Sequence, residues 1–396
     1  MSAAPAILPA SPPLPHAACT RPLRVCFVNL GAYGTLDASL AHPVGGEEVQ
    51  HALLASALAR RAEVSVSMVT CDIGQGRRRR THGIDVHACY RPSAGVRGLR
   101  FVPRWIGLHR ALAAADADVY YVSCAGALLG QVALFTSIKQ RALVFRVASD
   151  GDCDPRRMLV GSVKERVLYR LGLRRATRIT VQTEEQQRML RTRLGLDGRV
   201  VPMLVDAPAT QVSSAPRDID VLWVANLRAL KQPGKLVALA RRLPHRRFCL
   251  VGGAVAGEEE VARQLHHAAA AAPNLQLTGR LAYRDTLALF DRARLFVNTS
   301  RIEGFPNTFL QAWSRGVPVV SFVDPDALIA RAGLGAAVDD DDALVEQVER
   351  MLSDPATLRL AQERSRAWAA THCAAAPVVE TVVGLLRDAA QATRGG

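Results

Sequence analysis

Short apolar runs recur along the chain, separated by longer stretches in which apolar residues return every three or four positions. The runs are rich in Val, Ile, Leu and Phe, which is typical of strands buried on both faces of a parallel sheet. The pattern predicts strands at residues 24–30, 64–70, 84–89, 119–123, 142–148, 179–182, 200–204, 219–224, 247–251, 275–278, 294–297 and 317–322. Because these runs alternate with helical patterns, we predict an α/β fold built on parallel sheets.

The stretches with helical spacing predict helices that each bury one face. They lie at residues 49–58, 101–114, 127–137, 283–293, 306–315, 343–352 and 375–391, and Thr183 is expected to cap a further helix. A segment rich in Pro, Ser and Ala, residues 208–217, is typical of a linker. A chain of 396 residues is long enough for two domains, which we place at residues 21–207 and 218–373.

Residues 119–138 carry no charge, and twenty such residues could span a membrane. Ser123, Gly126, Gly130 and Gln131 would make a poor span, so we favour a buried strand, a turn and a helix. Residues 1–20 are rich in Ala and Pro and lack a basic start or a long apolar core. This composition favours a disordered lead-in over a signal peptide.

The chain is strongly basic, with 50 Lys and Arg against 36 Asp and Glu and a net charge of +14. Such a balance suggests an anionic partner: nucleic acid, anionic lipid or the phosphates of a small molecule. Residues 76–80, GRRRR, are predicted to form a basic loop that is either merely solvated or touches anionic lipid head groups. The eight cysteines stand singly, which indicates neither a zinc site nor a disulfide framework and fits a reducing cytoplasm.

The most informative stretch is residues 300–322, SRIEGFPNTFLQAWSRGVPVVSF. It follows a predicted strand, and Pro306 is expected to open the next helix, which Gly316 ends. Glu303 and the backbone amides of residues 304–307 therefore lie at the carboxyl end of a strand and the amino end of a helix. Open α/β sheets bind ligands at that place, and helix-start amides favour anions.

This stretch resembles the signature of retaining glycosyltransferases of the GT-B fold, in particular glycosyltransferase family 4. The family motif is a glutamate, seven residues and a second glutamate, and Glu303 matches the first position. Gln311 stands at the second, where the family's glutamate binds the nucleotide ribose; a glutamine keeps one carbonyl acceptor but has no charge. The resemblance implies two Rossmann-like domains facing across a cleft, and a terminal helix, residues 374–396, that crosses back to the first domain.

The resemblance also implies the donor site. The family's glycine pair before the first long helix faces the donor diphosphate and corresponds to Gly45 and Gly46. Its phosphate-binding lysine corresponds to Lys231, whereas Asn226 stands where an arginine is usual and Arg228 could replace that arginine. We therefore expect Glu303, Lys231 and Arg228 to be catalytic. The remaining expected donor-binding residues are Gly304, Phe305, Pro306, Asn307 and Gln311.

Residues 149–152, Ser-Asp-Gly-Asp, follow another predicted strand. Many family members have a histidine there, so Asp150 is a candidate site residue without an identical counterpart. An Asp-x-Asp pair could also bind a metal, as in glycosyltransferases of the other major fold, but the remaining signals favour GT-B. Since Lys231, Arg228 and helix-start amides can neutralise a diphosphate, we expect no metal or other cofactor.

The expected partners are a nucleotide-sugar donor and a glycan or lipid-linked acceptor, with a peripheral contact to an anionic membrane and no nucleic acid. The expected location is the cytoplasm, including the inner face of the membrane, and the expected role is in bacterial-type surface polysaccharide or glycolipid synthesis. Two alternatives stay open: a non-catalytic nucleotide-sugar-binding protein, and a GT-B epimerase acting on a nucleotide sugar.

Overall fold

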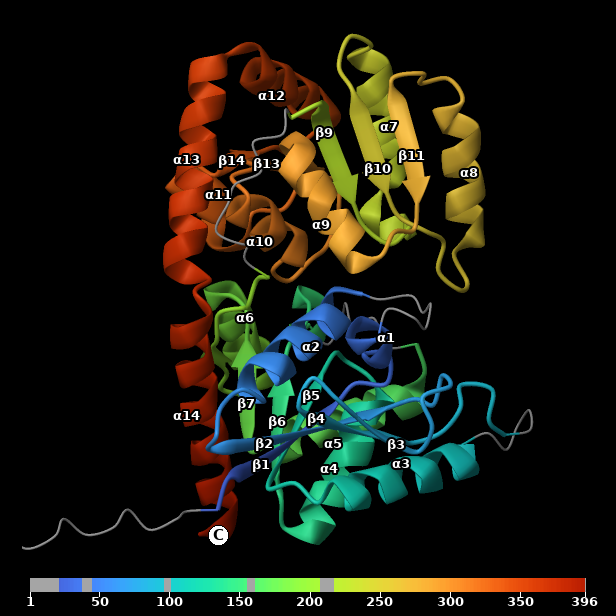
Figure 1. Ribbon diagram of the computed structural model, residues 1–396, viewed down its shortest axis with the longest axis vertical. Helices are drawn as coiled ribbons and strands as arrows, with labels where there is room; N and C mark the ends of the chain where they lie inside the picture. The colour runs from blue at the N-terminus through green and yellow to red at the C-terminus, as the bar shows by residue number, and fades with distance from the viewer. Residues whose placement is uncertain (1–20, 38–44, 96–100, 155–160, 207–216, 396) are drawn as a thin grey trace, which may run out of the picture.

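The fold is that of a computed structural model, described here for residues 21–37, 45–95, 101–154, 161–206 and 217–395 (Figure 1). It has two sheets, one in each half of the chain, with helices on both faces of each sheet. The predicted α/β architecture of two parallel-sheet domains is thus confirmed. The lead-in at residues 1–20 and most of the linker at 208–217 lie outside the described residues.

The first sheet has eight strands in the order β3-β4-β2-β1-β5-β6-β7-β8. They are β1 (Leu23–Val28), β2 (Val64–Thr70), β3 (Arg78–Thr81), β4 (Ile84–Ala88), β5 (Val119–Ser123), β6 (Ala142–Arg146), β7 (Arg178–Val181) and β8 (Arg199–Val200). All neighbouring pairs are parallel except β3 and β4. The carboxyl ends of seven strands therefore meet at one edge, where loops can form a site.

Helices cover both faces of this sheet. They are α1 (Tyr33–Leu36), α2 (Gly46–Leu58), α3 (Phe101–Ala115), α4 (Ala127–Lys139), α5 (Val163–Arg175) and α6 (Glu184–Met189). One apolar core holds residues of α2 on one face, and the other core holds residues of α3, α4 and α5 on the opposite face. The uncharged stretch at 119–138 is β5 followed by α4, so the strand-turn-helix interpretation is confirmed.

The second sheet has six parallel strands in the order β11-β10-β9-β12-β13-β14. They are β9 (Ile219–Val224), β10 (Phe248–Val251), β11 (Leu275–Gly279), β12 (Ala293–Asn298), β13 (Val319–Ser321) and β14 (Gly335–Ala337). The helices are α7 (Pro233–Arg242), α8 (Glu259–Ala269), α9 (Tyr283–Arg292), α10 (Asn307–Ser314), α11 (Leu328–Ala332), α12 (Asp341–Ser353) and α13 (Pro355–His372). Two apolar cores again lie one on each face.

The last helix, α14 (Ala375–Arg394), lies along the first domain (Figure 1). Its buried residues belong to the same core as β1, β5 and α2. Taken together, Pro355–Arg394 is the one stretch in the described part of the chain long and apolar enough to cross a membrane by length and composition. Because the apolar side of α14 is packed inside the first domain, burial in the core explains its composition.

Several local predictions need correction. Residues 78–81 of the predicted basic loop form β3, an edge strand paired with β4, because backbone pairing needs no apolar side chains. The strand predicted at 200–204 is only the two-residue β8. Helices α1, α5, α7, α8, α11 and α13 were not anticipated by the pattern. Arg217, expected at the end of the linker, donates to the carbonyls of Ala293, Arg315 and Gly316 and so belongs to the second domain.

Candidate active site

The loops after β9 and β12 bring together two predicted catalytic residues. Lys231 ends a short turn after β9, and its Nζ forms an ion pair with the Glu303 carboxylate although 72 residues separate them. Both side chains are largely buried. The Thr299 hydroxyl holds the backbone of Lys231 in place, since it donates to the Lys231 carbonyl at 2.7 Å. The result is a cation and a carboxylate held at the carboxyl edge of the second sheet.

The starts of two helices meet beside this pair. Gly46 begins α2 in the first domain, and Asn307 begins α10 in the second. A Cβ on Gly46 would lie 2.3 Å from Nδ2 of Asn307, so only glycine allows this approach. At the start of α2 the Gly45 amide donates to the Glu48 carboxylate at 3.0 Å. Both helix starts carry a partial positive charge, and together they favour an anion between the domains.

Gly304 lies where the two domains touch. A Cβ there would lie 2.6 Å from Oε1 of Gln182 and 2.7 Å from the carbonyl of Ala148, both in the first domain. The amide of the next residue, Phe305, donates to Oε1 of Gln182 at 2.7 Å, and Nε2 of Gln182 donates to Glu47 on α2 at 3.2 Å. Gln182 thus connects both domains, a role that the sequence analysis missed.

Asp150 approaches the same turn from the first domain. Its amide donates to the Glu303 carbonyl at 3.2 Å, and its carboxylate accepts from Gln186 at 3.0 Å. Burial raises the pKa of Asp150 above its ordinary value, and the carboxylates of Glu185, Asp326 and Glu303 add to this shift. The structure therefore places Asp150 next to Glu303, as a carboxyl that is easier to protonate than usual.

Asp152, the other half of the Asp-x-Asp pair, has a local role. Its Oδ2 accepts from the amides of Ala148 at 2.9 Å and Ser149 at 3.2 Å, which closes the turn after β6. Burial raises its pKa to about 6. In the described part of the chain, no group of three His, Cys, Asp or Glu side chains is positioned to hold a metal ion.

Two guanidinium groups lie at the edge of the second sheet. Arg228 is half-exposed, and its Nε lies 3.9 Å from Oε1 of Glu258. Burial raises the pKa of Glu48 at the start of α2, and the positive charge of Arg228 acts against this rise. Arg280 follows β11, and its Nη1 donates to Oδ1 of Asn226 at 3.1 Å. Asn226, at the position where the family has an arginine, is therefore bonded to an arginine from another strand.

Gly253, in the loop after β10, makes room for the Arg280 side chain. A Cβ on Gly253 would lie 3.0 Å from both Cβ and Nε of Arg280, so this arginine crosses directly over the glycine. Its Nη2 also donates to the Ala254 carbonyl at 2.7 Å. The sequence did place Arg280 two residues after the strand predicted at 275–278, but the contact of Arg280 with Asn226 depends on the fold.

Gln311 and Phe305 are held by packing. Gln311 lies on α10, is buried, and is close enough to Tyr283 at the start of α9 to lower the pKa of its phenol. Burial outweighs this effect and raises the pKa of Tyr283 to about 12. The Phe305 ring lies edge-on to Trp313 at 6.1 Å, and Pro306 is the N-cap of α10. Pro306 thus precedes the helix by one position relative to the prediction.

Comparison with protein families agrees with this geometry. Residues 219–354 match the model for glycosyl transferases group 1, and residues 45–205 match that for the glycosyl transferase 4-like domain. The chain carries the two domains of a GT-B glycosyltransferase. No curated protein sequence matches the chain.

Solved structures place this glycosyltransferase among proteins of the same fold. Sucrose-phosphate synthase from Thermosynechococcus elongatus superposes with a TM-score of 0.73 at 16% identity, covering 93% of this chain and 98% of that one. HepE from Anabaena, solved with UDP and glucose, gives a TM-score of 0.71 at 17% identity, covering 92% and 100%. WaaG, a glycosyltransferase involved in lipopolysaccharide biosynthesis, gives 0.67 at 14% identity, covering 91% and 99%. At these identities the likeness concerns the fold, and the predicted GT-B architecture is confirmed.

Proposed function

We propose that this glycosyltransferase is a retaining enzyme of family 4 that moves a sugar from a nucleotide-sugar donor to a glycan or lipid-linked acceptor. The observation that carries the proposal is the Lys231–Glu303 pair beside the meeting point of two helix starts, one from each domain. A nucleotide sugar has an anionic diphosphate joined to a hydroxyl-rich ring, and this place offers cationic groups next to a carboxylate.

In this proposal the chain stabilises the leaving group with fixed charge. The bond between the anomeric carbon and the diphosphate oxygen breaks, and negative charge develops on the phosphate. Lys231, Arg228 and the Gly46 amide at the start of α2 bind that charge, whereas the Gly45 amide donates to the Glu48 carboxylate. Preorganised donors of this kind act without reorganising during the reaction, and no metal is needed in this scheme.

Glu303 and the amides of Gly304 and Asn307 bind the sugar hydroxyls, because Pro306 has no amide hydrogen and the Phe305 amide donates to Gln182. Because the diphosphate leaves from the same face on which the acceptor oxygen attacks, the new bond has the configuration of the old one, and the acceptor proton passes to a leaving phosphate oxygen. Asp150 is next to the sugar in this arrangement. Gln311 is proposed to bind the nucleotide ribose without charge.

The substrates proposed are those of surface polysaccharide or glycolipid synthesis in the cytoplasm, at or near the inner face of the membrane. UDP-sugars are the first donors to test, because HepE was solved with UDP and glucose. The assay measures release of the nucleotide diphosphate with and without acceptor. Release that depends on an acceptor is expected of a transferase, whereas a binding protein or an epimerase would give none.

We predict that Glu303→Ala and Lys231→Ala lower acceptor-dependent turnover by about a hundredfold or more, the scale of losing one preorganised electrostatic group. Lys235→Ala is the matched control, since Lys235 pairs with Asp341 and lies over the Phe322 ring at 4.8 Å. Turnover of the control should stay within about twofold of the parent. Near-normal turnover of either site variant would remove that residue from the proposed mechanism.

The same assay with EDTA tests metal independence, and turnover is expected to continue. Loss of turnover that Mn²⁺ or Mg²⁺ restores would contradict the charge-based scheme. It would not contradict the transferase assignment, which depends on the acceptor requirement alone.

A further inference from the structure

Exposed apolar side chains gather on three consecutive helices of the first domain. Six large apolar side chains are markedly exposed in the described part of the chain, and five of them lie on α3, α4 and α5. They are Val102 (55% exposed), Ile106 (45%), Ile138 (73%), Val163 (72%) and Val167 (60%). Single exposed apolar residues are ordinary, but a cluster on one layer of the fold marks an interaction surface.

The same three helices are strongly basic. Their cations are Arg104, Arg110, Lys139, Lys164, Arg166, Arg170, Arg174 and Arg175, and their single acid is Glu165. The Glu165 carboxylate accepts from the amide of Ser162 at the start of α5. None of the eight cations is ion-paired with another residue that the structure describes. Arg104 donates to the carbonyls of Ala94 and Pro92 and lies over the Tyr90 ring, and the charge of the other seven is available to an anionic partner.

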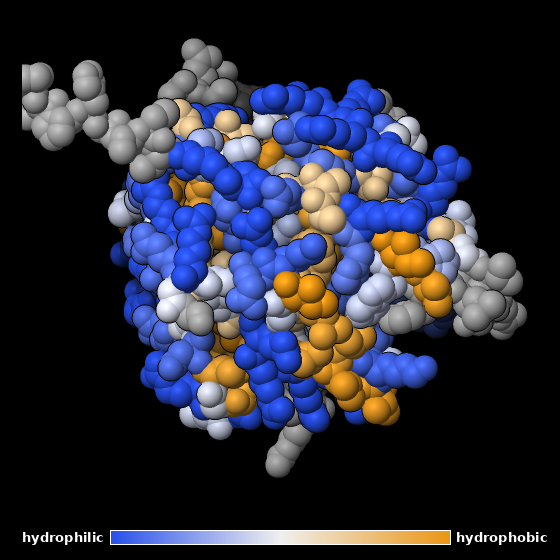
Figure 2. Space-filling view, turned by 90° about the horizontal axis from the view of Figure 1, so that it is seen from below, coloured by the Kyte–Doolittle hydropathy of each residue, from blue (hydrophilic) through white to orange (hydrophobic). Residues whose placement is uncertain are grey.

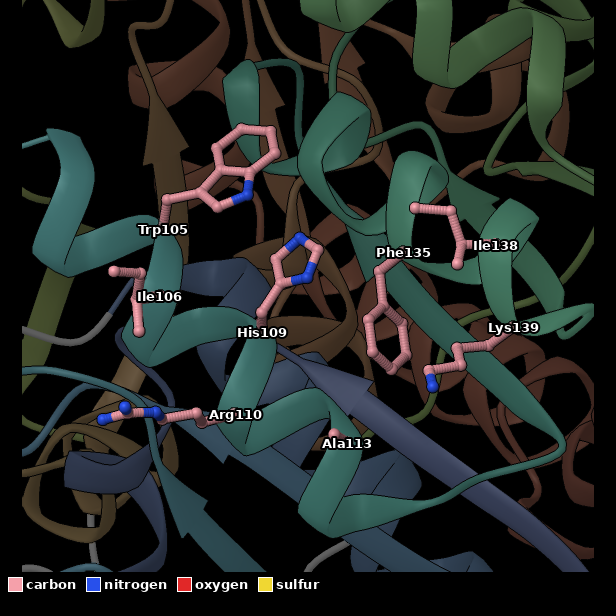
Figure 3. Close-up of a pocket in the computed structure, with 8 residues that line it drawn as sticks. All are labelled: Trp105, Ile106, His109, Arg110, Ala113, Phe135, Ile138 and Lys139. Carbon is pink, nitrogen blue, oxygen red and sulfur yellow. The ribbon is translucent and has the colours of Figure 1, made fainter.

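A groove runs between α3 and α4 within this surface (Figure 3). Trp105 stacks on His109 at 5.4 Å, and His109 meets the ring of Phe135 edge-on at 5.5 Å, which gives the groove an aromatic wall. Ile106 and Ile138 stand at its two rims, and Figure 3 shows the Lys139 amine turned toward Phe135. The lining is almost wholly apolar, with cationic groups at its margin.

The surface is outward-facing and firmly supported. α2 and α14 pack on the opposite face of the sheet, so α3, α4 and α5 form the outer layer on their side. Apolar side chains among hydrophilic ones are visible on the face seen from below (Figure 2). α4 and α5 pack at backbone distance, since a Cβ on Gly130 would lie 2.3 Å from the Leu168 carbonyl.

We propose that the α3–α5 surface docks this protein on an anionic lipid bilayer. The exposed Val and Ile side chains enter the interfacial layer, the surrounding Arg and Lys bind lipid phosphates, and the groove between α3 and α4 receives an acyl segment. Exposed apolar side chains and cations on the same three helices complement a surface that is apolar beneath an anionic layer. A nucleic acid would match the charge but leave the five aliphatic side chains in water.

The sequence suggested a membrane contact at the basic residues 76–80, whereas the proposed contact lies on the α3–α5 surface. Residues 78–81 are a paired edge strand with exposed arginines and no apolar side chain beside them on that strand. Charge alone gives weaker anchoring than charge together with inserted apolar groups. The proposal does not depend on the transferase chemistry, because none of its residues touches the Lys231–Glu303 pair.

The experiment is sedimentation of the full chain with vesicles of phosphatidylcholine alone or mixed with phosphatidylglycerol. The parent should bind the mixed vesicles and scarcely bind the neutral ones. Combined Ile106→Ser, Ile138→Ser and Val167→Ser should weaken binding by roughly tenfold or more. Combined Arg110→Gln, Lys139→Gln and Arg170→Gln should weaken it by roughly fivefold per charge and flatten its dependence on salt.

Leu360→Ser is the matched control, because Leu360 is the sixth exposed apolar side chain (47%) and lies on α13 in the second domain. It should bind vesicles as the parent does, and all variants should keep the parent's melting temperature and its turnover of soluble substrates. Absence of vesicle binding by the parent would overturn the proposal. The proposal would also be overturned if changing Arg77 to Arg80 to Ser abolished vesicle binding while the α3–α5 variants still bound. A third contradicting outcome is a dimer in solution that the α3–α5 substitutions dissociate.

Discussion

A single glycine, Gly304, lets the two domains meet at the candidate active site. Its neighbours Gln182 and Ala148 come from the first domain, and the adjacent Phe305 amide is hydrogen-bonded to Gln182. The same peptide segment supplies the amides proposed to bind the sugar. Position 304 therefore links the spacing of the domains to the position of the Glu303 carboxylate next to it.

We predict that Gly304→Ala lowers turnover by about a hundredfold, the cost of displacing reacting groups by about 1 Å. The added methyl would overlap both Gln182 and a backbone carbonyl, so the domains must separate to accommodate it. Gly234→Ala is the control, because a Cβ there meets nothing within 4 Å. Steady-state kinetics with donor and acceptor make the measurement, and equal turnover of the two variants would show that this contact does not set the geometry of the site.

At the scale of elements, the crossing of α4 and α5 depends on small residues from both helices. A Cβ on Gly172 would lie 2.5 Å from Cγ of Leu129, and one on Gly130 would lie 2.3 Å from the Leu168 carbonyl. The two glycines bring the helix backbones together and so fix the relative positions of Ile138 and Val167. The rigidity of the proposed docking surface follows from this crossing.

Gly172→Ala should reduce the free energy of unfolding by about 1–3 kcal/mol, because the helices must move apart to admit a methyl group. Gly384→Ala provides the comparison: it lies on an exposed position of α14 with nothing within 4 Å of the added Cβ. That change should stabilise the protein by about 0.5–1 kcal/mol through helix propensity. Denaturant unfolding measures both, and equal stabilisation by both substitutions would contradict the close crossing.

At the scale of the whole molecule, helix α14 belongs to the core of the first domain although the second domain precedes it in the sequence. α14 packs on α2, β5 and β6, so the core of the first domain includes residues from two distant parts of the sequence. A second connection runs the other way, since the Asp326 carboxylate accepts from the amides of Glu184 at 2.9 Å and Glu185 at 3.0 Å, at the start of α6. The two domains are therefore connected through α14 and through the contact of Asp326 with the start of α6.

Leu386→Ala, at a fully buried position of α14, should destabilise the first domain by about 2–5 kcal/mol. Hydrogen exchange should then speed up in α2, β5 and β6 more than in β9 to β12. Leu360→Ala on α13 is exposed and should change stability by less than about 0.5 kcal/mol. Faster exchange confined to the second domain would contradict the role of α14 as part of the first domain's core.

The sequence by itself determined the α/β class, most of the buried strands and the position of Glu303 after a strand, and its resemblance to GT-B glycosyltransferases indicated Lys231. The first three follow from local patterns, because apolar periodicity and helix-start residues act over a few positions of the chain. It did not determine β3, whose exposed arginines have no apolar pattern and which is a strand only because β4 offers it hydrogen bonds. Backbone pairing of this kind depends on a partner strand, and the residues of β3 do not indicate where that partner lies.

Only the tertiary structure decided which residues face one another across the cleft. Gln182 reaches Phe305 from 123 residues away, and Arg280 reaches Asn226 from 54 residues away, on loops that meet because parallel strands end at one edge. The docking surface is likewise a property of three helices side by side, since none of them alone has enough exposed apolar residues to mark a site. Such groupings arise because packing brings distant positions within a few ångströms, whereas local patterns extend over one or two turns of helix.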